Sequence, residues 1–87
     1  MSDGSWREKD GTLTKTYSFA TYLQGINFTI RIAEIAEFLN HHPDILITYR
    51  KVTIYSSTHE AGGIVTKKDQ ELATKFDEIY LQMCPPE

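Results

Sequence analysis

The 87-residue chain has room for one domain, and it carries a net charge of −3 with acidic and basic residues interleaved. This charge pattern argues against nucleic acid as a direct partner. No apolar run approaches the ~20 residues of a membrane span, and Met1 to Gly4 do not resemble a signal peptide, so we expect a soluble, cytoplasmic protein. Cys84 is the single cysteine, which excludes an internal disulfide bond.

The first predicted elements are two strands, over residues 5–9 and 12–18. They flank Asp10-Gly11, a dipeptide typical of tight hairpin turns because glycine accepts a positive φ. Beyond the turn, the odd-numbered positions from Leu13 to Phe19 are mostly apolar, which is the alternation of a half-buried strand.

A helix is predicted from about residue 20 to residue 40, and it is apolar on two faces. At 100° per residue, the two stripes are Phe19, Leu23, Ile26, Ile30 and Ala33, and, nearly opposite, Phe28, Ile32, Ile35 and Leu39. One face can cover a sheet, but a chain this short has little left to cover the other. We therefore expect a homo-oligomer, a dimer or tetramer, built through this helix and a sheet edge.

Two more strands are predicted over residues 45–49 and 52–57, where β-branched and aromatic residues are frequent. A loop follows over residues 61–65. Thr66 then has the features of a helix N-cap, with Asp69 at the third helical position of a capping box, and this last helix ends at Pro85-Pro86. The predicted domain, residues 1–87, is α+β in the order β-β-α-β-β-α, with helices on one face of a four-stranded antiparallel sheet.

All three histidines lie between Glu37 and Asp69. His41 and His42 precede Pro43, where a helix must stop, and His59 follows the last predicted strand. Histidine is the side chain that exchanges protons near neutral pH with little tuning. A histidine pair at a helix end, facing a histidine at a strand end, therefore predicts a polar pocket.

Three explanations of the histidines remain open from the residues alone. A zinc site could use the histidines and Cys84, although adjacent histidines are awkward ligands for one ion. A purely structural explanation places His41 and His42 at the negative end of the helix dipole and His59 in an exposed loop. The third is a proton-transfer site with a nearby carboxylate. Glu37, one turn before His41, is a candidate for that carboxylate, or it reaches water from a frayed helix end.

The segments around the histidines resemble one known family. The order Glu37-x3-His41-His42-Pro43, then Tyr49, His59 and Asp69 is similar to the signature of the pterin-4a-carbinolamine dehydratases. Flanking segments that also resemble the family are Asn40-His41-His42-Pro43-Asp44, Thr58-His59-Glu60-Ala61-Gly62-Gly63 and Asp69-x-x-Leu72-Ala73. The resemblance covers Trp6 to about Ile79. Family members usually begin with an extra helix before the Trp6 region, so we expect that helix to be missing or shortened here.

The resemblance implies an enzyme that needs no cofactor and no metal. Family members remove water from a 4a-hydroxytetrahydropterin, such as 4a-hydroxytetrahydrobiopterin, and the quinonoid dihydropterin formed is recycled for aromatic amino acid hydroxylases. An imidazolium can protonate the leaving hydroxyl while a neutral imidazole accepts a proton from the pterin ring. The implied catalytic residues are His41, His42 and His59.

The resemblance also implies substrate contacts and supporting residues. The implied contacts are Asn40, His41, His42, Ser57, Thr58, His59 and Glu60. Glu37 is expected to orient the neighbouring histidine. Trp6 is expected to stack on the pterin or form a wall of its pocket, although a lone tryptophan is more often a core residue. Asp69 belongs to the signature, although its capping-box position explains it without chemistry.

A second implied function belongs to a different class. Some family members are dimerisation cofactors of a homeodomain transcription factor and bind it through the helix that forms their tetramers. The two apolar stripes of the 20–40 helix are compatible with such a coactivator, which would have a protein partner and a nuclear location. The presence of His41, His42 and His59 favours the enzyme, because a binding module has no need of them.

Overall fold

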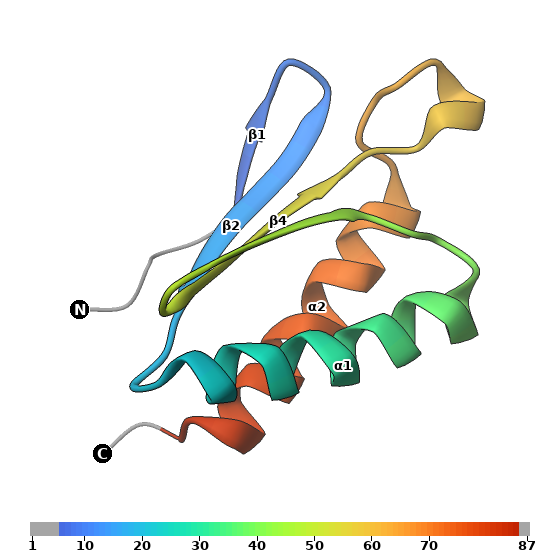
Figure 1. The fold of residues 1–87 in the computed structure, drawn as a ribbon. Coiled ribbons are helices and arrows are strands. Elements are labelled where there is room, and N and C mark those ends of the chain that lie inside the picture. Colours follow the sequence, from blue (N-terminus) through green and yellow to red (C-terminus); the bar gives the residue numbers. More distant parts are fainter. Residues whose placement is uncertain (1–5, 86–87) are drawn as a thin grey trace.

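The computed structural model describes residues 6–85, and the elements follow the predicted order (Figure 1). They are β1 (Arg7–Lys9), β2 (Thr12–Ser18), α1 (Tyr22–Leu39), β3 (Asp44–Thr48), β4 (Lys51–Ser56), the short 3-10 helix η1 (His59–Ala61) and α2 (Lys67–Met83). β3 and β4 each begin and end one residue earlier than predicted, and η1 was not predicted. The expected loss of an N-terminal helix concerns residues 1–5, which lie outside the described residues.

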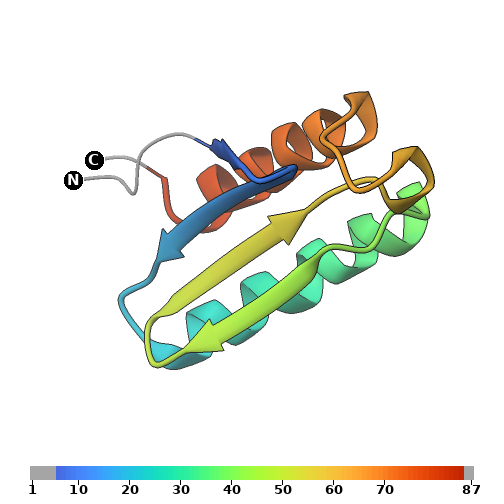
Figure 2. The same ribbon diagram turned by 90° about the horizontal axis from the view of Figure 1, so that it is seen from above.

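The four strands form one antiparallel sheet in the order β1-β2-β4-β3. Asp10 and Gly11, at φ 54° and 78°, make the turn between β1 and β2, as the dipeptide predicts. Both helices cover the same face of the sheet (Figure 2), which confirms the predicted α+β layers. In that view α2 follows the side of β1 and β2, and α1 follows the side of β3.

The core lies between the sheet and the two helices. Alternate residues of β2 and β4 point into it, and α1 contributes the stripe that contains Phe28 and Ile32. The fully buried apolar side chains are Tyr17, Phe28, Ile32, Val52, Ile54, Leu72 and Phe76. Most of the other stripe of α1 faces outward, with Leu23 64% and Ile30 55% exposed, and Phe38 at the end of the helix is 85% exposed.

One carboxylate on α2 ties the N-terminal hairpin to the helical layer. Asp77 accepts hydrogen bonds from Trp6 Nε1 at 3.2 Å, from Lys15 Nζ at 2.9 Å and from the Tyr17 hydroxyl at 2.6 Å. Burial, and then the neighbouring Asp77, raise the pKa of Tyr17, so its hydroxyl stays a proton donor.

Neither described helix is both long enough and apolar enough to cross a bilayer.

Candidate active site

The C-terminal end of α1 forms one wall of the candidate site. The helix ends in a Schellman motif: Asn40 adopts the left-handed conformation (φ 52°) and its N–H donates to the Glu37 carbonyl, while the His41 N–H donates to the Ala36 carbonyl. The helix therefore stops at Leu39, before Pro43 is reached. This turn ties the backbone of His41 to the last turn of α1 and thereby fixes its direction.

The opposite wall comes from the segment after β4. Thr58 pairs with Ile64, and its carbonyl oxygen accepts from the N–H groups of Ala61 and Gly63, which closes a tight loop around η1. Gly63 adopts a positive φ of 77°, a conformation that suits glycine. The loop, which contains η1, lies at the same end of the sheet as the end of α1 and the start of α2 (Figures 1 and 2).

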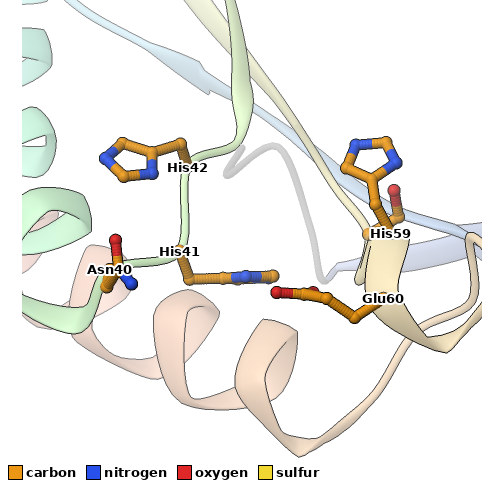
Figure 3. A pocket seen from close by; sticks show the side chains of 6 residues that line it. Asn40, His41, His42, His59 and Glu60 are labelled. Atoms are coloured by element: carbon orange, nitrogen blue, oxygen red, sulfur yellow. The ribbon is translucent and has the colours of Figure 1, made fainter.

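The two walls enclose a cavity of about 290 Å³. Its lining residues are Asn40, His41, His42, Ser57, His59 and Glu60. The rings of the adjacent His41 and His42 point in different directions, with His59 on the facing wall, and the Glu60 side chain extends toward His41 (Figure 3). The structure thus brings together in one cavity all but one of the residues expected to contact a substrate.

The exception is Thr58, which is buried and does not line the cavity. Its hydroxyl lies 2.6 Å from that of Thr66 and donates to Asp69 Oδ2 at 2.7 Å. Thr58 therefore supports the wall through its side chain.

Asp69 does not line the cavity and is fully buried. Its Oδ1 lies 2.6 Å from His41 Nε2 and accepts from the Ser56 hydroxyl, and its Oδ2 accepts from the Thr58 hydroxyl and from the Thr66 N–H at 2.9 Å. Burial alone would raise the pKa of this carboxyl group. The hydrogen bonds from His41, Ser56, Thr66 and Thr58 outweigh burial and lower the pKa to about 2.

Asp69 is also the third residue of α2, and the predicted capping box with Thr66 is present. Ser56 is the member of this network that the sequence analysis missed. It follows Val52 and Ile54 on the inward face of β4, and all three are buried. A polar residue at the next inward position of a buried strand is the signal that could have identified it.

Glu37 pairs with His42, while His41 is bound by Asp69. Glu37 Oε2 lies 2.6 Å from His42 Nε2, and both side chains are largely exposed. The pair is positioned by the last turn of α1, and it leaves the other ring nitrogen of His42 free to take part in hydrogen bonding.

Two other predicted participants lie elsewhere. Trp6 does not line the cavity; its ring packs edge-on against Tyr17 at 6.1 Å and its N–H donates to Asp77. Cys84 follows the C-terminal end of α2, whereas Asp69 lies in the first turn of that helix. Across residues 6–85, no three histidine, cysteine, aspartate or glutamate side chains are grouped closely enough to hold a metal ion.

Comparison with known proteins agrees with the arrangement of these residues. A family model described as pterin 4 alpha carbinolamine dehydratase matches residues 1–79. The chain belongs to the pterin-4a-carbinolamine dehydratase family. The signature residues from Glu37 to Asp69 all fall within the matched range, so the family resemblance drawn from them is confirmed.

Relatives from other organisms carry the same family name. A pterin-4-alpha-carbinolamine dehydratase homologue of Herpetosiphon aurantiacus is 52% identical over 75 residues, which cover 86% of this chain and 77% of that protein. A homologue of Opitutus terrae is 45% identical, over 85% of this chain and 76% of its own length.

Two solved structures share the fold. A transcriptional coactivator/pterin dehydratase from Brucella melitensis aligns with a TM-score of 0.80 at 29% identity, over 85% of this chain and 80% of that one. A pterin dehydratase-like protein that is a RuBisCO assembly factor in the alpha-carboxysome aligns with a TM-score of 0.74 at 25% identity, over 87% and 89% of the two chains. The fold is thus shared by proteins described by different functions.

Proposed function

We propose that this chain dehydrates a 4a-hydroxytetrahydropterin to the quinonoid dihydropterin by histidine acid–base catalysis. The observation that carries the proposal is one cavity lined by three imidazoles together with short polar side chains. A volume of about 290 Å³ is close to the lower limit of ligand sites, which span roughly 300–1,000 Å³, and suits a small bicyclic ring.

The reaction requires two proton transfers and no net change in charge. The C4a–O bond breaks, and the departing oxygen takes one proton and leaves as water. The pterin N5 releases its proton, and a double bond forms between C4a and N5. An imidazolium supplies the first proton and a neutral imidazole accepts the second, and each such transfer typically contributes about 10²–10⁴-fold. His41, His42 and His59 are the groups in the cavity suited to both roles.

The remaining lining residues suit the polar edge of a pterin. That edge presents amide-like N–H and C=O groups together with an amino group. The Asn40 amide and the Ser57 hydroxyl can both donate and accept, and the Glu60 carboxylate can accept from N–H groups. These residues give the site a way to hold the ring while the histidines act on C4a and N5.

The test is the ultraviolet decay of freshly generated 4a-hydroxytetrahydropterin in the presence of wild type, His42→Ala or His59→Ala. We expect wild type to accelerate the decay and each variant to lose most of the acceleration while remaining folded by circular dichroism. Folded wild type that matches buffer would overturn the proposal.

A second candidate function rests on the exposed apolar stripe of α1, which contains Leu23 and Ile30. A coactivator role, the term used in the description of the Brucella protein, would use such a face to bind a protein partner. Self-association would use it equally well. An experiment can separate protein binding from dehydration. Substitutions on the exposed stripe of α1 should weaken the binding of a partner whose mass differs from that of this chain, whereas dehydration depends on the histidine cavity.

A further inference from the structure

The environment of Asp69 determines which nitrogen of His41 carries a proton. Asp69 is 0% exposed, and each of its oxygens lies within hydrogen-bond distance of two partners. Thr66 contributes a backbone N–H, which can only donate. The carboxylate is ionised near neutral pH and has no proton to give, so the proton between Asp69 and His41 belongs to Nε2 of the imidazole.

A neutral imidazole has one N–H, so Nδ1 of a neutral His41 is bare. Nδ1 has no hydrogen-bond partner among the described residues, and no buried side-chain nitrogen or oxygen among them lacks a partner. Nδ1 is therefore accessible to solvent. Because His41 is a lining residue of the histidine cavity, Nδ1 is the nitrogen through which it can meet a ligand.

We propose that Asp69 is a positioning residue that holds His41 in the Nε2–H tautomer and makes Nδ1 the atom that accepts the substrate proton. The catalytic part of this inference rests on the proposed dehydration. The negative Asp69 stabilises the imidazolium that forms when Nδ1 takes the N5 proton, which assigns His41 the role of base. The leaving hydroxyl then takes its proton from the imidazolium of His42 or His59, and the histidines return to their starting states by exchange with water.

Asp69→Asn tests the tautomer with little change in shape. The Thr66 N–H must keep an oxygen as its acceptor, so the amide oxygen of asparagine occupies the Oδ2 position. The amide nitrogen then faces His41 and Ser56 and donates to them. The Ser56 hydroxyl can rotate to accept, but His41 can accept at Nε2 only by moving its own proton to Nδ1. The variant keeps the helix cap and reverses the tautomer.

The readout that does not depend on activity is the ¹⁵N spectrum of the histidine rings, in which a protonated nitrogen and a bare nitrogen are distinct. In spectra recorded with the His41 ring in its neutral form, we expect His41 to be Nε2–H in wild type and Nδ1–H in Asp69→Asn. A wild-type His41 with its proton on Nδ1 would overturn the proposal, whether or not the variant folds.

The second readout is the dehydration rate. We expect Asp69→Asn to lose about 10²–10⁴-fold, as expected when a base is held in the wrong tautomer. Ser56→Ala is the matched control, because it removes a donor from the same carboxylate oxygen but leaves Nε2–H bound to Asp69; it should keep the tautomer and most of the rate.

The outcomes separate this inference from the proposed function. If wild type dehydrates the pterin and Asp69→Asn does so equally well with a reversed tautomer, the positioning role is wrong and the dehydratase stands. If Ser56→Ala loses as much rate as Asp69→Asn without a change of tautomer, the carboxylate acts only through packing and the inference is wrong. If wild type shows the Nε2–H tautomer but no dehydration, the catalytic assignment fails together with the proposed function, while the tautomer assignment stands.

Discussion

Gly11, in the first hairpin turn, lies directly against the carbonyl oxygen of Gly63 in the loop that carries His59. A Cβ on Gly11 would lie 2.2 Å from that oxygen, well inside van der Waals contact. The neighbouring backbone would therefore have to move to accept any side chain. The β1–β2 turn thus braces one wall of the cavity from outside the site.

Gly11→Ala should displace this loop and destabilise the protein. The control is Gly63→Ala, because both glycines have nearly the same positive φ, 78° and 77°, but a Cβ on Gly63 meets nothing within 4 Å. Both variants carry the backbone strain, and only Gly11→Ala adds the clash. We expect urea unfolding to show an additional loss of about 1–3 kcal/mol for Gly11→Ala. Equal losses for the two variants would show that the turn does not brace the loop.

Acid should weaken the protein through Asp69. Its folded pKa is lowered from 3.8 to about 2, so the stabilisation is fully present above the unfolded pKa of 3.8 and is lost as the pH falls through 2. A shift of this size corresponds to about 2–3 kcal/mol. Urea unfolding between about pH 5 and pH 2 should therefore show a shallower loss of stability for Asp69→Asn than for wild type. Parallel curves would contradict a carboxylate stabilised by its four donors.

The Glu37–His42 pair should contribute much less than the buried Asp69–His41 pair. Both side chains are largely exposed, and an exposed ion pair is worth about 0–1 kcal/mol. Glu37→Gln should change the free energy of unfolding by no more than that. If the pair only orients His42, the dehydration rate should fall by at most about fivefold. A loss as large as that of His42→Ala would give Glu37 a direct part in the chemistry.

The outward stripe of α1 should mediate self-association. Ile30→Glu places a charge on this stripe, whereas Asn27→Glu places the same charge on an exposed polar position of the same helix. Light scattering at micromolar concentration should give an oligomer for wild type and Asn27→Glu and a monomer for Ile30→Glu. A monomeric wild type would remove the basis for the predicted dimer or tetramer.

The fold was largely predictable because its signals are local. The Asp10-Gly11 turn, the two helical periods and the Thr66–Asp69 capping box each involve residues a few positions apart, and each is present in the structure. Asn40 shows the limit of such signals. Pro43 suggested where the helix must stop, but the stop is set by Asn40 in a left-handed conformation, which only a few residue types adopt readily.

The residues that line the site could be predicted from the sequence, but the hydrogen bonds between them could not. Family resemblance named the lining residues, yet no local pattern indicates that a capping carboxylate reaches His41, 28 residues earlier in the chain, or Ser56, 13 residues earlier. Those contacts depend on how β4, α1 and α2 meet. Glu37 was likewise expected to orient a neighbouring histidine, but the sequence did not show that this histidine is His42.

Asp69 binds both the first turn of α2 and His41, so the position of His41 depends on whether that turn is folded. Its Oδ2 holds the Thr66 N–H at the start of α2, and its Oδ1 holds His41. When the first turn of α2 opens, the imidazole loses its anchor although the rest of the sheet and core stay folded. Local opening costs less free energy than global unfolding. On heating, the fraction of competent molecules should therefore fall before the melting transition, and amide exchange at Thr66 should follow that fraction.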